Sequence, residues 1–189
     1  LFAEEGIRYC LIAGVDSFLV ASTLAAYEEK NRLQTSKNSD GFIPGEAGAA
    51  MLIGPTSEIS ETGLSCLGLG FGQERATVES EDPLKADGLV AAIRSALSEA
   101  GRTMGDMDYR ITDLSGEQYG FKEASLALSR TLRSRKERFD LWHPADCIGE
   151  VGAAIVPCML GVLLAARRKN YAPGKNALCH AANDSGERA

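Results

Sequence analysis

The chain has 189 residues, of which 44% are hydrophobic and 24% are charged, a composition typical of one globular domain. Its net charge of −6 argues against nucleic acid or an anionic membrane as the main partner, because no basic face dominates. Five cysteines without a CxxC pair and only two histidines predict neither a disulfide framework nor a metal site, and no motif predicts a cofactor.

The sequence also carries no sign of export or of membrane insertion. The N-terminal residues lack the basic flank of a signal peptide, so we expect reduced thiols and a cytoplasmic location. The longest apolar run, residues 152–166, is too short to cross a bilayer and contains Pro157. We therefore expect this run to form a buried helix.

Apolar runs and helical spacing define the expected elements. Asp16 or Ser17 is the expected cap of the first helix, and Gly101 ends the second. Pro157 is expected to break a hydrogen bond near Ala153. In chain order, we expect a strand at 9–14, a helix at 18–30, strands at 47–53 and 65–71, a helix at 84–100, a strand at 109–111, a helix at 120–135, an extended segment at 138–141, a helix at 149–168 and a strand at 176–182.

This order of strands and helices predicts a layered α/β fold. The strands are short, continuous apolar runs, which favours burial on both faces. We therefore expect one mixed β-sheet with helices on its faces and with the apolar helix at 149–168 buried at the centre.

Two short segments contain residue types that could do chemistry. Ser115 lies between a strand and a helix, where either a catalytic loop or a helix cap is expected, and a lone serine favours the cap. His143, Asp146 and Cys147 precede the apolar helix. A thiol at a helix start with a nearby histidine is a candidate nucleophile, although the Asp146 carboxylate opposes thiolate formation, and a structural role is the simpler reading.

Four segments together resemble a known family. They read GIRYCLIAGVDS, DGFIPGEAGAAMLIG, CIGEVGAAIVPCMLGVLLAARRKNYAPG and NALCHAANDSGERA. They are similar to the C-terminal half of a β-ketoacyl-(acyl carrier protein) synthase of the thiolase superfamily. The resemblance implies that residues 1–189 form a thiolase-like C-terminal domain, in which the glycine-rich DGFIPGE loop enters a core strand close to the active site.

The catalytic residues of that family are not retained at the matching positions. No residue of this chain matches the nucleophilic cysteine, which we expect in a segment outside it. The first catalytic histidine falls on Asp113 or Ser115 and the second on Asp146, three residues after His143. Ionised aspartates accept hydrogen bonds, whereas condensation needs donors for the developing oxyanion.

Further positions of the family pattern also differ. The lysine and glutamate that the family pairs fall on Leu141 and Ile155, and of the glycine-rich turn at residues 182–186 only Gly186 remains. It is chemically reasonable that both charges are lost together, because removing one alone would leave the other buried and unpaired.

The resemblance leaves three functions open. The first is a degenerate synthase-like domain in or beside fatty acid or polyketide synthesis, which pairs with an N-terminal synthase half or a partner protomer and contacts acyl carrier protein. The second is an acyltransferase with non-standard acid-base residues and a cysteine from outside this chain. The third is an acyl-binding module without chemistry.

Overall fold

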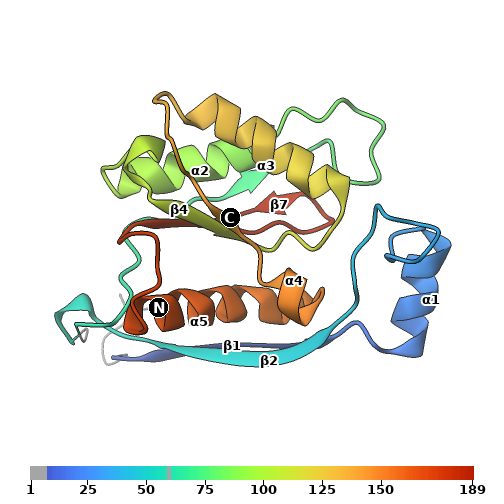
Figure 1. Ribbon diagram of the computed structural model, residues 1–189, viewed down its shortest axis with the longest axis horizontal. Coiled ribbons are helices and arrows are strands. Elements are labelled where there is room, and N and C mark those ends of the chain that lie inside the picture. The colour runs from blue at the N-terminus through green and yellow to red at the C-terminus, as the bar shows by residue number, and fades with distance from the viewer. Residues whose placement is uncertain (1–7, 59–60) are drawn as a thin grey trace.

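The computed structural model describes residues 8–58 and 61–189 as layers of helices and sheets (Figure 1). The elements are β1 (Cys10–Ser17), α1 (Ala21–Glu29), β2 (Glu46–Ile53), β3 (Gly72–Gln73), α2 (Asp87–Glu99), β4 (Tyr109–Thr112), α3 (Gln118–Thr131), β5 (Leu141–Trp142), α4 (Ala145–Ile148), α5 (Ile155–Arg168), β6 (Ala177–His180) and β7 (Glu187–Arg188). Within the described ranges, no helix is both long and apolar enough to cross a membrane.

Helix α5 lies between two sheets and is the central layer (Figure 1). Ile155, Met159 and Leu163 pack against Tyr109 and Ile111 of β4 and are at most 8% exposed. On its other side α5 contacts the antiparallel ribbon of β1 and β2. The expected α/β fold with a buried central helix is therefore confirmed.

A second core covers the opposite face of the sheet that contains β4. Helices α2 and α3 contribute Leu89, Ile93 and Ala127 to this core, where they meet Leu178 of β6. In the sheet, β4 is the middle strand and runs parallel to both β5 and β6. Helices thus cover both faces of the parallel sheet.

The prediction of one continuous sheet is wrong, because the described strands form three separate sheets. Residues 65–71 form no strand, since their glycines pack against helix α2 instead. A Cβ atom at Gly70 would lie 1.9 Å from the carbonyl oxygen of Ala92, and one at Gly68 would lie 2.2 Å from that of Ala96. The alternating glycines therefore allow this segment to pack closely against a helix, and they do not belong to a paired strand.

The apolar helix begins later than the sequence predicts. Residues 152–154 form a short 3-10 turn, and α5 starts at Ile155. Pro157 therefore lies in the first turn of α5, where backbone N–H groups have no partner within the helix. The broken hydrogen bond expected near Ala153 corresponds to this 3-10 turn. The amide of Ala153 donates instead to Asp16 Oδ2 at 3.0 Å.

The outer face of the β1–β2 ribbon is apolar and uncovered. Leu11 lies opposite Leu52, and Val15 lies opposite Gly48. Leu11 and Leu52 are each 65% exposed and Val15 is 80% exposed. Helix α1, beside the ribbon in Figure 1, buries none of its residues. This part of the chain therefore presents an apolar surface that the described residues do not cover.

Replacing Gly70 by alanine tests the packing of residues 65–71 on α2. The added methyl group would overlap the Ala92 carbonyl, so we expect Gly70→Ala to lower the free energy of unfolding by about 1–3 kcal/mol. Gly48→Ala is the matched control, because a Cβ atom there meets only the side chain of Val15, at 3.5 Å. Urea unfolding measures both, and equal losses in the two variants would contradict the close contact.

Candidate functional site

The DGFIPGE segment joins two loops that meet near the start of the central helix. The amide of Gly45 donates to Glu150 O at 2.9 Å, and the amide of Glu150 donates to Ile43 O at 2.7 Å. A Cβ atom at Gly45 would lie 2.1 Å from the carbonyl oxygen of Ile148, so this approach requires glycine. The glycines therefore bring the loop before β2 against the loop before α5.

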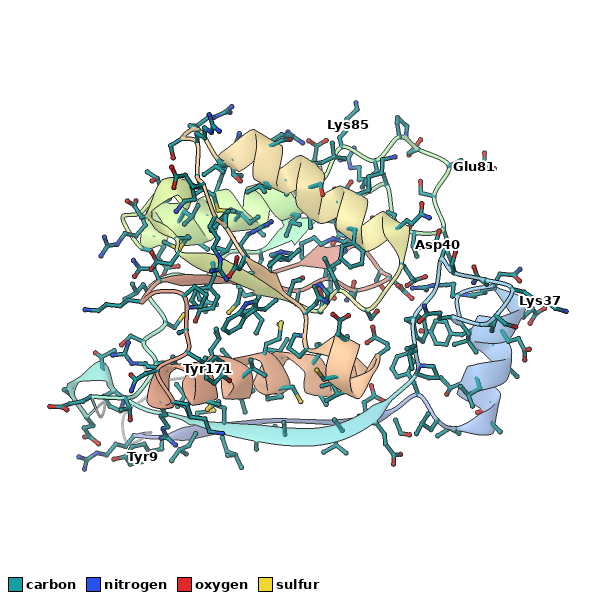
Figure 2. All side chains as sticks on the ribbon, in the orientation of Figure 1. Tyr9, Lys37, Asp40, Glu81, Lys85 and Tyr171 are labelled. Atoms are coloured by element: carbon teal, nitrogen blue, oxygen red, sulfur yellow. The ribbon has the colours of Figure 1, made fainter. Side chains whose placement is uncertain are left out.

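Asp40, at the start of the same segment, holds a third loop. Its Oδ1 atom accepts a hydrogen bond of 2.7 Å from the amide of Gln118, the first residue of α3. Figure 2 shows Asp40 between the loop that follows α1 and the helices above it. A carboxylate at a helix N-terminus satisfies an otherwise unpaired N–H group and is favoured by the helix dipole. The segment thus positions the 113–117 loop as well.

Asp113 is fixed by acceptor contacts on both carboxylate oxygens. Oδ1 accepts from the Thr112 hydroxyl at 3.1 Å, and Oδ2 accepts from the amide of Ala182 at 2.6 Å. Burial raises the pKa of Asp113 to about 6, and the nearby charge of Glu150 acts in the same direction, while the two hydrogen bonds oppose the rise. At pH 7 this side chain is therefore mostly an ionised acceptor.

His180 is a buried residue of this site that sequence reasoning did not identify. The parallel register places it beside Thr112, and its Nδ1 atom lies 3.1 Å from the Thr112 hydroxyl oxygen. Because that hydroxyl donates to Asp113, the geometry assigns the proton of the neutral ring to Nδ1. Burial, together with the charge of Arg110, lowers the pKa of His180 to about 4. The only sequence signal was a polar residue at the end of an apolar strand.

Asp113, Ser115, Glu150 and His180 line one small cavity of about 110 Å³. At its edge Arg32 binds two acids, with Nη2 2.7 Å from Glu117 Oε2 and Nη1 2.6 Å from Asp184 Oδ2. Asp113 and Ser115, which the sequence singled out, thus line one cavity together with residues from five other parts of the chain: Arg32, Val78, Leu89, Glu150 and residues 180–188.

His143, Asp146 and Cys147 do not line this cavity. His143 Nδ1 lies 2.9 Å from Asp146 Oδ2, and its ring packs edge-on against Phe121 with centroids 5.5 Å apart. Asp146 and Cys147 are exposed on α4. The short helix therefore forms a separate cluster at the surface.

The structure does not bring Leu141 and Ile155 together. Ile155 packs with Trp142 in the core that covers α5, whereas Leu141 lines a groove with Phe121 and Leu128 of α3. Because successive strand residues point to opposite faces, Leu141 and Ile155 lie on different sides of β5. The argument from loss of a paired charge at these two positions is therefore wrong.

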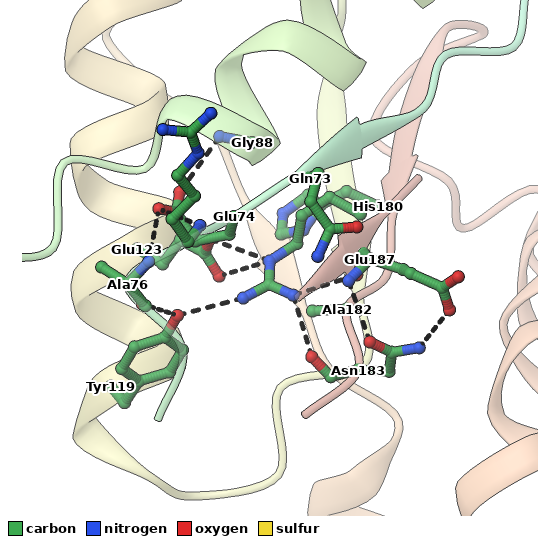
Figure 3. A network of polar contacts seen from close by, with 12 residues as sticks. Gln73, Glu74, Ala76, Gly88, Tyr119, Glu123, His180, Ala182, Asn183 and Glu187 are labelled. Carbon is green, nitrogen blue, oxygen red and sulfur yellow. Dashed lines mark hydrogen bonds and ion pairs between the residues drawn. The ribbon is translucent and has the colours of Figure 1, made fainter. Parts of the chain in front are cut away.

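A buried ion pair that the sequence did not predict lies beside the cavity. Arg188 Nε is 2.9 Å from Glu123 Oε1, and both side chains are at most 2% exposed. The guanidinium group also donates to the Tyr119 hydroxyl at 3.0 Å and to Asn183 O at 2.9 Å (Figure 3). The partners are 65 residues apart, so no local pattern signals the pair. The network fixes the β6–β7 turn against α3.

The buried His180 predicts a loss of stability in acid. A histidine whose folded pKa is lowered to about 4 stabilises the fold above its unfolded value near 6.5. This contribution, about 3 kcal/mol, is lost as the pH falls towards 4, because the unfolded chain binds the proton more readily. In His180→Asn, which keeps an amide to bond Thr112, we expect a weaker dependence over this range. Urea unfolding between pH 7 and 4 tests this, and equal slopes for both proteins would refute it.

No model of a known protein family and no curated protein sequence matches the chain. Solved structures do match it over nearly its whole length. The oxazolomycin ketosynthase domain OzmH KS7 of Streptomyces albus JA3453 aligns with 96% of the chain at a TM-score of 0.77 and 15% identity. The ishigamide ketosynthase/chain length factor aligns with 96% at a TM-score of 0.70 and 18% identity.

A third match is the structure of a type II polyketide synthase acyl-carrier protein in complex with its ketosynthase bound to the hexaketide. It aligns with 97% of the chain at a TM-score of 0.77 and 13% identity. The chain covers 40%, 52% and 55% of these three structures, respectively. It therefore has a ketosynthase-like fold and spans about half the length of these structures.

Proposed function

We propose that this chain is the C-terminal part of a ketosynthase-like protein that does not catalyse condensation with its own side chains. It acts in or beside fatty acid or polyketide synthesis by pairing with a synthase half or a partner protomer. The observation that carries this proposal is the Asp113 carboxylate, both of whose oxygens accept hydrogen bonds within the chain.

The chemistry of condensation explains why this observation matters. Decarboxylative condensation needs hydrogen-bond donors at the developing enolate and oxyanion. The resemblance expects one donor at Asp113 or Ser115, and of these Asp113 is engaged as an acceptor by Thr112 and Ala182. Asp146, at the second such position, is exposed and lies against His143. Neither aspartate, when ionised, offers a donor to a bound thioester.

The uncovered ribbon supports a role through pairing. An isolated two-stranded sheet is marginally stable in water, and exposed apolar patches commonly mark contact surfaces. The outer side chains of β1 and β2, among them Leu11, Val15 and Leu52, form such a patch. One similar structure is a ketosynthase/chain length factor and another contains an acyl-carrier protein. We therefore propose a second synthase half and a carrier protein as the partners.

One observation favours a second candidate function, an acyltransferase with non-standard acid-base residues. A carboxyl group with a pKa of about 6, linked through Thr112 to a neutral histidine, is suited to proton transfer near neutral pH. In this alternative, Asp113 acts as the acid-base group and the nucleophilic cysteine comes from outside the chain. Acyl binding in the Asp113 cavity is less favoured, because about 110 Å³ is small for a ligand pocket.

A carrier-protein assay separates these functions. The chain is combined with the N-terminal synthase half that carries the nucleophilic cysteine and incubated with malonyl- and acyl-carrier protein, while carbon dioxide release and ketoacyl product are followed. We expect no turnover above background, since loss of one oxyanion donor alone costs about 10²–10³ in rate. Turnover that Asp113→Asn abolishes would establish the acyltransferase instead. Turnover that Cys147→Ala abolishes would overturn both assignments, because that thiol would then be the nucleophile.

The pairing surface has its own test. We expect the chain to be larger than a monomer in light scattering at high concentration, and Val15→Glu to shift it towards monomer by placing a charge in the apolar face. Leu69→Glu is the matched control, because Leu69 is 60% exposed but lies outside the ribbon. A stable monomer in the unsubstituted protein, or equal effects of both substitutions, would contradict pairing through this face.

A further inference from the structure

Arg110 is an unusual residue for its place in the fold. It lies in β4, the middle strand of the parallel sheet, and is only 8% exposed. Its neighbours Tyr109 and Ile111 face α5, so the Arg110 side chain points to the other face of the sheet, towards α3. A buried guanidinium group is costly unless it is paired with an acid and fully hydrogen-bonded.

The described residues do not satisfy this guanidinium group. Its Nε atom is buried without a hydrogen-bond partner, and no ion pair to Arg110 is present in residues 8–58 or 61–189. The close contact is the ring of Phe139, whose centroid lies 4.8 Å from the guanidinium carbon. Desolvation, with no carboxylate acting against it, lowers the pKa of Arg110.

Arg110 lines a groove that is large enough for a ligand. The groove has a volume of about 530 Å³ and runs along α3 to the segment at 132–135. This volume falls within the range of about 300–1,000 Å³ that is common for small-molecule sites. Its walls are mainly apolar, with Phe121, Ala124, Leu128 and Leu141 among them.

The rim of the groove is basic, although the protein as a whole is acidic. Residues 130–140 contain five basic and two acidic side chains, in a chain with a net charge of −6. Arg130 and Arg138 are paired, with Asp87 and Asp140 respectively. Arg133 and Arg135 line the groove, are exposed, and form no ion pair with any described residue. Their charge favours an anion at this mouth.

We propose that this groove binds an amphipathic anion, with a carboxylate or phosphate head on Arg110 and an apolar body along α3. The head would supply the acceptor that Arg110 Nε lacks, in a setting where charge-assisted bonds are strong. The apolar body would cover Leu128 and Leu141. The site lies on the α3 side of the parallel sheet, on the other face from the β1–β2 ribbon, and shares no lining residue with the Asp113 cavity, so it does not depend on the proposed pairing.

Titration calorimetry with three ten-carbon probes tests this site. We expect decanoate or decyl phosphate to bind with a Kd below about 1 mM, and decan-1-ol, which has the same chain without the charge, to bind at least tenfold more weakly. Tighter binding of decyl phosphate than of decanoate would assign a phosphate head, and the reverse would assign a carboxylate. Failure of both anions to bind at about 1 mM, or equal binding of the alcohol, would overturn the proposal.

Two substitutions locate the binding in the groove. Arg110→Met should weaken binding of the anion about 10- to 100-fold, the effect of losing a charged hydrogen bond. It should leave the fold intact, because replacing a buried charged side chain by an apolar one commonly has little effect on stability. Ser125→Trp, at an exposed groove position on α3, should block the site without touching Arg110. Arg102→Met, an exposed arginine outside the groove, is the matched control, and equal effects of Arg102→Met and Arg110→Met would refute the site.

Discussion

The burial of helix α5 between two sheets is the constraint on which the rest of the structure depends. A helix that is apolar on opposite sides needs cover from both, and here β4 supplies one side and the β1–β2 ribbon the other. The start of this helix is therefore fixed in the interior, and Asp16 holds it through the Ala153 amide. The loops that reach that start become the place where distant parts of the chain meet.

Those loops form a rigid polar site rather than an open one. The close approach of Gly45 to the Ile148 carbonyl leaves no space for a side chain, and Asp113 is held between Thr112 and Ala182. The hydrogen bonds that fix a residue also determine what it can offer to a ligand. A carboxylate already used as a double acceptor serves to join loops, and this structural use is the physical basis of our proposal that the chain acts without condensation chemistry.

The sequence predicted the elements better than it predicted their assembly. The apolar run at β4 and the helical spacing of α2 and α3 are local signals, and each predicts the correct element. Gly68 and Gly70 have the spacing of strand residues, and nothing in sequence shows that a helix carbonyl lies opposite them. For the site, the family resemblance identified Asp113 as a candidate residue. The roles of His180 and of the Glu123–Arg188 pair depend on tertiary contacts between residues at least 65 apart, which periodicity does not report.

The proposed pairing through the β1–β2 ribbon would link the lifetime of this chain to the supply of its partner. A surface that binds a partner in the folded state but not in the unfolded state makes the folded fraction depend on partner concentration. When uncovered, the same side chains, Leu11, Val15 and Leu52, are the kind that chaperones and proteases engage. Copies made in excess of the partner would be removed, and the ratio of the two proteins would be set by degradation as much as by synthesis.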